Sequence, residues 1–378
     1  MSEWKEYTLL ELCEIHDTKR KPISSTEREK IKGSFPYYGA SGIVGYINDY
    51  IFSYDTILIS EDGENLNSRK TPIAFRATGK YWVNNHAHVL LPKSEHYFPI
   101  IINYLEAMDL NSYITGAVQP KLSQENLLKI TITMPAVEEE QRAIAGVLSS
   151  LDDKIDLLHR QNKTLEGMAA AVFRHFLVDN RKATWQECTV SGLADHEKTS
   201  IHPNRNPATL FYHYSIPAFD ESHMPVHELG ALIQSNKYEV MKNTILFSKL
   251  NPHKDKRVWL IPSSIAKNSV CSTEFQVMNP KAEKYLFFLY SFISHPGNYD
   301  EIAAGVGGTS GSHQRIDPEV IFRFMCFLPD DNTLTDYNEM VEQIFGKMHH
   351  NRKSIQTLIH HRDTLLPKLM SGEVSVKV

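Results

Sequence analysis

Hydrophobic and polar positions divide the chain into two segments, and each segment is followed by a long helix. In the first segment, strands are predicted at 55–60, 87–91 and 129–134, where short runs are rich in β-branched residues or alternate apolar with polar positions. A short helix is predicted at 99–108, and the glycine-rich stretch 35–46 is predicted to be a loop leading into another strand. This mixture predicts an α+β fold.

From residue 138 the apolar positions change to alternate spacings of three and four, which is the heptad pattern of a coiled coil. The pattern returns near the C-terminus. The predicted seam positions are Leu148, Leu151, Ile155, Leu158, Asn162 and Leu165 in the first helix, and Val341, Ile344, Met348, Asn351, Ile355 and Leu358 in the second.

A single amphipathic helix of this length needs a partner for its apolar stripe. We expect each long helix to pair with the other in an antiparallel coiled coil. Asn162 and Asn351 interrupt the two seams, and a polar seam residue commonly fixes the register of a helix pair. A core helix that folds back on its own domain is the alternative.

The two segments are similar in sequence and form an internal duplication. Trp4 is matched by Trp185, the stretch 55–60 by 243–248, and Met134 by Leu328. These matches lie 181, 188 and 194 positions apart, and the helical seams match at 193. Offsets that grow slowly along the chain indicate one duplicated unit with a few loop insertions.

Composition narrows the class of protein. The 378 residues suffice for two or three domains, and 42% hydrophobic with 22% charged residues is typical of a globular chain. Four scattered cysteines indicate reduced thiols rather than a disulfide framework or a cysteine-rich metal ribbon. The chain begins without the pattern of a signal peptide and has no apolar run long enough to span a bilayer, so we expect a cytoplasmic protein.

Charge alone does not predict nucleic-acid binding, because the net charge is −5. Local basic clusters do exist, however, and they matter more than the sum. They lie at 19–21, at 69–80 and at 249–257. A solvated loop surface is the alternative explanation for each cluster.

Sequence signatures of catalysis are missing. The chain contains no phosphate-binding GxxxxGK[ST] loop, no GxSxG nucleophile elbow and no HExxH metal motif. The stretch 251–254 only faintly resembles the Asn-Pro-Pro-aromatic motif of adenine methyltransferases. Glu61, Asp62 and Glu64 surround Gly63 and favour a turn over a nuclease site, and the paired histidines at 349–350 and 360–361 favour a solvated helix face over a metal site.

Several stretches resemble the specificity subunits of Type I restriction–modification systems. The stretch FPYYGASGIVGYI at 35–47 is similar to the early loop and strand of a target recognition domain, and ISEDGEN at 59–65 and WVNNHAHVL at 82–90 follow in the family's order. The stretch EEQRAIAGVLSSLDDKI at 139–155 resembles the family's central helix, and RDTLLPKLMSGEV at 362–374 resembles the end of its distal helix.

The resemblance implies two mixed α/β target recognition domains and two spacer helices packed as an antiparallel coiled coil. We expect the first recognition domain at 1–136, the central spacer helix at 137–179, the second recognition domain at 180–331, and the distal helix with the C-terminal tail at 332–378. Each recognition domain would read one half of a bipartite, gapped DNA target.

The resemblance also implies that the chain is not itself a catalyst. It would bind double-stranded DNA and dock methyltransferase subunits and restriction subunits. No cofactor is expected in this chain, since S-adenosylmethionine, Mg²⁺ and ATP would be bound by the partner subunits, and no metal site is expected. The alternatives left open are an enzyme, such as a fused adenine methyltransferase or endonuclease fragment, and a coiled-coil adaptor with no DNA role.

Candidate DNA-binding residues are those that offer cations, amides, hydroxyls or close backbone approach on loops. In the first domain they are Lys19, Arg20, Lys21, Gly39, Ser41, Gly42, Asn65, Arg69, Lys70, Arg76, Thr115, Gln119 and Lys121. In the second domain they are Lys249, Asn251, Lys254, Arg257, Thr309, Ser310, His313, Gln314 and Arg315. The glycine-rich loop at 305–312 would suit close approach to phosphate, with a plain flexible loop as the alternative.

Overall fold

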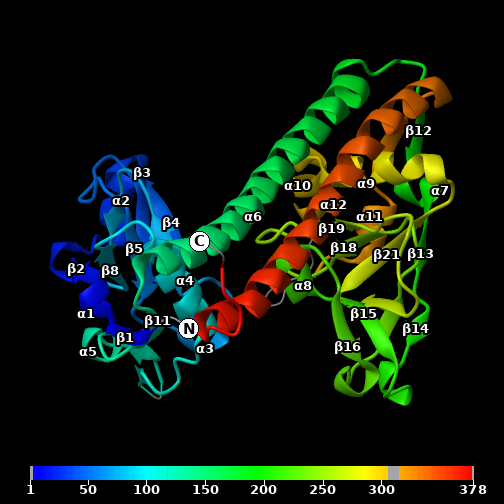
Figure 1. Ribbon diagram of the computed structural model, residues 1–378. Coiled ribbons are helices and arrows are strands. Elements are labelled where there is room, and N and C mark those ends of the chain that lie inside the picture. Colours follow the sequence, from blue (N-terminus) through cyan, green and yellow to red (C-terminus); the bar gives the residue numbers. More distant parts are fainter. Residues whose placement is uncertain (1–2, 117, 305–314, 377–378) are drawn as a thin grey trace. The chain divides into compact units, whose positions relative to one another are not determined.

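The computed structural model describes residues 3–116, 118–304 and 315–376, and Figure 1 labels the elements. The chain forms two compact units. The first unit comprises Met1–Ile155 with Thr357–Val378, and the second comprises Asp156–Gln356. Each unit therefore combines one α/β segment with a part of each long helix. The domain boundaries predicted above were placed where an α/β segment gives way to a long helix. The compact units are defined by packing, and they divide each long helix between them.

A four-stranded antiparallel sheet, in the order β2-β8-β5-β6, is central to the first unit. Its strands are β2 (Cys13–Ile15), β5 (Thr56–Ser60), β6 (Ala74–Ala77) and β8 (Ala87–Pro92). All five residues of β5 are buried. The strands expected at 55–60 and 87–91 are thus confirmed, and β5 is a central strand covered on both faces.

A second sheet, in the order β4-β3-β7, contains the stretch predicted to be rich in turns. Its strands are β3 (Lys32–Gly39), β4 (Gly42–Ile47) and β7 (Trp82–Val83), with β3 and β7 parallel. Gly42, which follows the tight turn between β3 and β4, has a φ of +119°, a conformation that favours glycine. Two small antiparallel pairs complete the strands of this unit: β1 (Trp4–Thr8) with β11 (Thr131–Pro135), and β9 (Ile114–Thr115) with β10 (Lys121–Leu122).

The first unit also contains several short helices. They are α1 (Leu9–Leu12), the 3-10 turn η1 (Asp17–Lys19), α2 (Ser25–Lys30), α3 (Asn65–Ser68), α4 (Tyr97–Ala107) and α5 (Gln124–Leu127). Thr8 and Ser24 begin α1 and α2 with reciprocal capping hydrogen bonds to Glu11 and Glu27. The helix expected at 99–108 is confirmed as α4.

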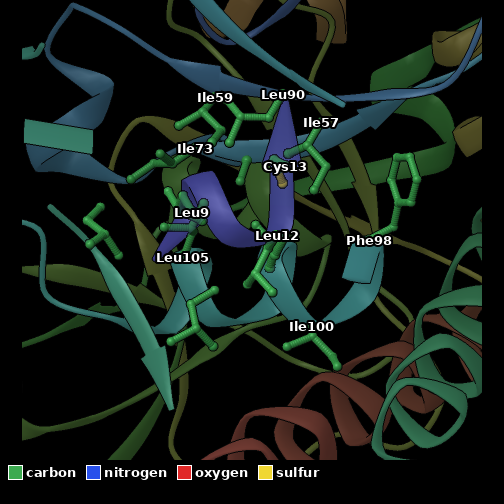
Figure 2. Close-up of a cluster of buried hydrophobic side chains, with 14 of the residues drawn as sticks. Leu9, Leu12, Cys13, Ile57, Ile59, Ile73, Leu90, Phe98, Ile100 and Leu105 are labelled. Carbon is green, nitrogen blue, oxygen red and sulfur yellow. The ribbon is translucent and has the colours of Figure 1, made fainter. Parts of the chain in front are cut away.

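The main core of the first unit lies between this sheet and its helices. Figure 2 shows side chains from α1 and β2 facing those of β5 and β8, with α4 on the other side. The labelled residues are Leu9, Leu12, Cys13, Ile57, Ile59, Ile73, Leu90, Phe98, Ile100 and Leu105. Full burial of such a side chain contributes about 1.5–3 kcal/mol, so this cluster dominates the stability of the unit.

The second unit repeats the same plan. Its four-stranded sheet has the order β13-β21-β18-β19, from β13 (Ala194–Glu197), β18 (Ile245–Ser248), β19 (Val258–Leu260) and β21 (Phe275–Pro280). Its other large sheet has the order β14-β17-β20-β15-β16, from β14 (Ser200–Ile201), β15 (Leu210–Tyr214), β16 (Val226–Leu229), β17 (Lys237–Glu239) and β20 (Ser269–Ser272). The pair β12 (Gln186–Thr189) and β22 (Met325–Leu328) corresponds to β1 with β11.

The helices of the second unit are also short. They are α7 (Val190–Leu193), η3 (Pro203–Arg205), α8 (Ile216–Ser222), η4 (Gly230–Leu232), η5 (Glu283–Tyr285), α9 (Leu286–Ser294), α10 (Pro296–Ala304) and α11 (Pro318–Phe322). All four cysteines of the chain are free. Cys188 and Cys326 are directly opposite on β12 and β22, with their sulfur atoms 3.5 Å apart.

Strand register shows the duplication in detail. Ile57 lies opposite Leu90 in the first unit, and Ile245 lies opposite Met278 in the second, each residue 188 positions after its counterpart. The parallel pairing of β3 with β7 also recurs, as β15 with β20. The internal repeat inferred from a few sequence matches is therefore a repeat of sheet order, strand direction and register.

The two long helices are α6 (Glu138–Phe173), which continues into the π-helical segment η2 (Arg174–Asp179), and α12 (Asp331–Met370). Within the second unit, Asn162 of α6 contacts Asn351 of α12, and Ala169 packs with Ile344 and Met348. Because residue numbers rise along one helix as they fall along the other, the pairing is antiparallel.

Within the first unit the same direction holds. Asp152 of α6 pairs with Arg362 of α12, and Leu148 shares a core with Leu366 and Leu369. Every predicted seam position is buried or half-buried. Pro367 lies inside α12, which ends at Met370 and so continues for three residues beyond the proline.

Candidate nucleic-acid interface

Several of the predicted site residues of the first domain gather where β5 ends. Ser60, the last residue of β5, donates from Oγ to the carbonyl oxygen of Ala40 in the β3–β4 turn, at 2.5 Å. The loop between β9 and β10 reaches the same strand end, because Leu122 N donates to Glu61 O at 2.8 Å and Gly63 N donates to Pro120 O at 3.0 Å. The structure thus brings two glycine-containing loops together at the end of β5.

Each of these two loops carries predicted DNA-binding residues. The β3–β4 turn places Gly39, Ser41 and Gly42 beside the end of β5. In the second loop, Thr115 pairs with Lys121 across the small β9–β10 hairpin, and Gln119 is exposed between them. Hydroxyl, amide and backbone groups on adjacent exposed loops can reach base edges or phosphates. These residues therefore remain candidate DNA contacts.

Arg20 belongs to a network of charges below the loop surface. Its Nη1 donates to Glu61 Oε2 at 2.6 Å and to Ala87 O at 2.8 Å, and its Nη2 lies 3.3 Å from Asp17 Oδ2. The Arg20 side chain is only 14% exposed. These contacts occupy much of the guanidinium, so its structural role is to hold η1 against the ends of β5 and β8 rather than to reach DNA directly.

His88 completes this network. Its Nδ1 lies 2.6 Å from Asp17 Oδ2 and its Nε2 lies 2.8 Å from Leu122 O, while the ring is almost wholly buried. Both ring nitrogens face oxygen acceptors, so both hydrogen bonds form when each nitrogen carries a hydrogen. The imidazole therefore ties η1 to the β10 segment.

The network also determines how Glu61 ionises. Burial would raise the pKa of Glu61, but the hydrogen bond from Arg20, the charges of His88 and Arg20, and the hydrogen bond from Lys121 together lower that pKa below its usual range. Lys121 Nζ lies 3.2 Å from Glu61 Oε1. Glu61 is therefore a half-buried anion with its own cations, where the sequence predicted a simple turn residue.

Asp17, Glu61 and His88 lie close enough to hold a metal ion between them. Arg20 and Lys121 already neutralise the two carboxylates, and both nitrogens of His88 are directed at protein oxygens. The chemistry of the donor set favours a salt-bridge network over a metal centre.

Two other arginines predicted to contact DNA are engaged elsewhere in the fold. Arg69 has a left-handed backbone with a φ of 46°, and its guanidinium donates to Glu106 O and Met108 O at the end of α4. Arg76 on β6 pairs with Asp55 and Glu95, at the opposite end of β5 from the loops. The structure does not bring Arg76 together with the other candidates, and both side chains have structural contacts.

The remaining candidates of the first domain lie at its surface. Lys19 donates to the hydroxyl of Tyr54 at 2.9 Å, while Lys21 and Lys70 are exposed. Asn65 closes the loop after α3, since its amide exchanges hydrogen bonds with the backbone of Thr71. Among the candidate cations of the first domain, Lys19, Lys21 and Lys70 thus have no carboxylate partner in the described part of the chain, whereas Lys121 is paired with Glu61.

In the second domain, Lys249 and Arg315 meet at the equivalent strand end. Ile316 N donates to Lys249 O at 3.1 Å, and Leu250 pairs with Arg315 in an isolated bridge. The guanidinium of Arg315 makes a two-fold contact with Glu274, at 2.7 and 3.0 Å. Asn251 turns the chain with a φ of 47°, and Lys254 is exposed three residues later.

Arg257 has a different role from the one predicted for it. It is 8% exposed and pairs with Asp220 at 2.6 and 2.7 Å and with Asp255 at 2.9 Å. A guanidinium held by two carboxylates and largely buried serves the fold. Thr309, Ser310, His313 and Gln314 lie outside the described residues.

Sequence reasoning missed the contribution of Asp17 and His88 because their partners are distant in the chain. Asp17 and His88 are separated by 71 positions, and Arg20 and Glu61 by 41. Glu61 directly follows one predicted strand, and His88 lies near the start of another. These positions were the only sequence feature that could have indicated that the residues meet at the same end of the sheet.

Comparison with known proteins identifies similar sequences and a similar fold. Residues 1–167 match the family model described as the Type I restriction modification DNA specificity domain. A putative type I restriction enzyme specificity subunit from Haemophilus influenzae is 34% identical over 149 residues, which is 39% of this chain and 37% of the relative. The chain therefore aligns with little more than a third of that relative's length.

A second relative aligns along the whole chain. The specificity subunit of the Type I restriction enzyme MjaIX from Methanocaldococcus jannaschii is 24% identical over 100% of this chain and 97% of its own. The crystal structure of the S subunit of a Type-I restriction-modification system from M. genitalium has the same fold, with a TM-score of 0.60 and 15% identity, covering 97% of this chain and 96% of that one.

None of the helices in the described ranges is both long enough and apolar enough to cross a bilayer. Residues 1–167 thus match a Type I restriction modification DNA specificity domain, and the whole chain is similar in sequence to the MjaIX specificity subunit and in fold to the S subunit from M. genitalium.

Proposed function

We propose that this chain selects a bipartite, gapped DNA target for a Type I restriction–modification complex. Each α/β domain reads one half of the target through the loops at the end of its central strand, β5 or β18. The spacer between the halves is set by α6 and α12. The chain itself carries out no chemistry.

The repeat of strand register is the observation that carries this proposal. Two copies of one sheet present loops at the same strand end, with Glu61 O bonded to Leu122 N in one and Lys249 O bonded to Ile316 N in the other. The two four-stranded sheets share strand order and register, while the segments between their strands differ, since the offset between the copies rises from 181 at β2 to 188 at β5. A shared scaffold with different loops suits two domains that read different half-sites.

The long helices supply a spacer. At 1.5 Å per residue, the 36 residues of α6 correspond to about 54 Å of helix, which exceeds one turn of B-DNA at roughly 34 Å. A pair of antiparallel helices of this length is suited to half-sites that lie on a duplex with an unread gap between them.

We infer the partners from the similarity to Type I specificity subunits. Methyltransferase subunits would dock on this chain and carry S-adenosylmethionine, and restriction subunits would supply the steps that need Mg²⁺ and ATP. The candidate DNA contacts are the surface cations Lys19, Lys21 and Lys70, the two loops at the end of β5, and Lys249, Lys254 and Arg315 in the second domain. Arg20, Arg69, Arg76 and Arg257 are better assigned to the fold, because carboxylates or backbone carbonyls hold them.

DNA binding and activity of the purified complex test this function. The chain with its methyltransferase partner should bind DNA with a steep salt dependence and a sequence preference, and methylation should require both proteins. The chain alone, given DNA with S-adenosylmethionine or Mg²⁺, should neither methylate nor cleave it. Methyl transfer or cleavage by the chain alone would establish an enzyme, and a complex without sequence preference would leave only an adaptor.

A further inference from the structure

The two domains carry opposite charges at one equivalent position. The 188-residue offset between β5 and β18, and between β8 and β21, places Lys249 where Glu61 stands and Gln276 where His88 stands. In the first domain these two positions are close, since His88 Nδ1 lies 3.8 Å from Glu61 Oε2. An acid and a histidine are thus replaced by a lysine and an amide.

A third position also changes from an acidic residue in the first domain to a basic residue in the second. His16 N donates to Val89 O in the first domain, and Glu197 lies opposite Val277 in the second, so His16 corresponds to Glu197. The next residue is Asp17 in the first domain and Lys198 in the second. The buried carboxylate of one copy is therefore a cation in the other.

The side chains of Lys249 and Gln276 lie on one face of their sheet. Phe247 and Met278 pack in one core cluster of the second unit, whereas Leu246 and Val277 pack in another. Since side chains alternate along a strand, Gln276 shares the face of Phe247 and Met278, and Lys249 continues that face beyond the end of β18.

Gln276 has an unusual environment for a polar side chain. It is fully buried, and neither its Nε2 nor its Oε1 has a hydrogen-bond partner within the described part of the chain. Burying an amide without a partner costs free energy, because its hydrogen bonds to water are lost. A ligand that accepts a hydrogen bond from Nε2 would recover part of that free energy.

The cations above Gln276 lack a full set of counterions. Burial lowers the pKa of Lys249, and the nearby charges of Arg315 and Lys198 lower it further, against the opposing effect of Glu274. Glu274 is the carboxylate that Arg315 already holds at 2.7 Å. Among the described residues, Lys198, Lys249 and Arg315 therefore share Glu274 as their acid, where the first domain balances two carboxylates with Arg20 and Lys121.

We propose that Lys198, Lys249 and Arg315, above the amide of Gln276, bind a phosphate of the DNA backbone in the second domain, and that the first domain has no such site at the equivalent position. The inference rests on the proposed function and makes it more specific. Phosphate contacts fix the position of a protein on the duplex, so this site would anchor the second domain more firmly than the first.

Salt dependence of DNA binding tests this site in the complete complex with the methyltransferase partner. Lys249→Gln should weaken binding to the target at every salt concentration and reduce the slope of log K against log [salt] by about 0.9, the value for one lost phosphate contact. Lys249→Arg should retain the slope, because the charge is kept. Lys242→Gln is the matched control, since Lys242 is exposed and precedes β18 at the opposite end of the strand.

Two comparisons separate the possible failures. Glu61→Gln, the change at the equivalent position of the first domain, should leave the slope unchanged although it weakens the charge network. Thermal unfolding of each variant confirms that it is folded. If the wild-type complex shows no sequence preference, the proposed function fails. If the wild type discriminates its target but Lys249→Gln has the slope of Lys242→Gln, the phosphate site is wrong and the function stands.

Discussion

Asn351 of α12 donates a hydrogen bond from Nδ2 to Oδ1 of Asn162 on α6, at 3.0 Å, next to the apolar contact of Ala169 with Ile344 and Met348. Both asparagines are buried, and Asn351 is completely so. A buried polar pair of this kind stabilises one helix register over its alternatives, because any shift leaves the amides without partners. The pair therefore fixes how the two halves of the spacer align.

Replacing one member of this pair should destabilise the chain more than replacing both. Asn351→Leu leaves the amide of Asn162 buried without its partner, which we expect to cost about 1–3 kcal/mol in the free energy of unfolding. The double variant Asn162→Leu with Asn351→Leu should recover most of that loss. Urea unfolding of the wild type, both single variants and the double variant measures the difference. Equal losses that simply add would show that the hydrogen bond does not couple the helices.

Arg362 should stabilise the other end of the spacer. Its Nη1 contacts Asp152 Oδ1 at 3.0 Å, and Asp152 Oδ2 also accepts a hydrogen bond from Asn103 of α4 at 2.8 Å. Arg362→Ala should reduce the free energy of unfolding by about 1 kcal/mol, which is at the upper end for a partly exposed ion pair. Arg160→Ala, which breaks the exposed pair with Asp156 on α6 itself, is the control and should cost roughly half as much or less.

Acid should weaken the charge network at the end of β5. The pKa of Glu61 is lowered relative to its ordinary value of 4.5, so its ionised form stabilises the folded state above that pH, and this stability is lost as the pH falls through the lowered value. Glu61→Gln should therefore be less stable than the wild type at about pH 6, and the difference should shrink below about pH 4. Thermal unfolding across this range measures it. A difference that does not change with pH would mean that the charge of Glu61 contributes nothing.

Lengthening the spacer should change the gap in the target and leave the half-sites alone. One heptad inserted beside Asn162 in α6, with a matching heptad beside Asn351 in α12, preserves the seam and adds about 10.5 Å of helix. That length corresponds to about three base pairs of B-DNA, at roughly 3.4 Å per base pair. Methylation of targets with graded gaps would measure the shift. Altered half-sites with an unchanged gap would contradict the role of the helices as a spacer.

Much of the fold could be predicted because it depends on local or repeated patterns. The short run of apolar and β-branched residues around Ile57 and Ile59 indicated a strand, and the three-and-four spacing from Leu148 to Leu165 indicated a helix seam. Both are properties of neighbouring residues. The duplication added a second, independent occurrence of each element.

The candidate site was harder to predict, because the fate of a charged residue depends on partners far away in the chain. Lys19, Arg20 and Lys21 form one basic run, yet Lys19 and Lys21 are exposed and Arg20 is bound by Glu61 and Asp17. Similarly, Lys254 is exposed while Arg257 is held by Asp220. Local sequence cannot distinguish a cation that faces DNA from one that neutralises a buried carboxylate.

Genome-wide mapping of methylated adenines tests the central claim most directly. Cells would carry the methyltransferase partner with either the wild-type chain or a variant whose residues 180–331 are replaced by those of a related second domain. The wild type should give a bipartite motif with a fixed gap, and the variant should change one half-site while the other half-site and the gap remain. A continuous motif, or a replacement that changes both halves or neither, would contradict the account.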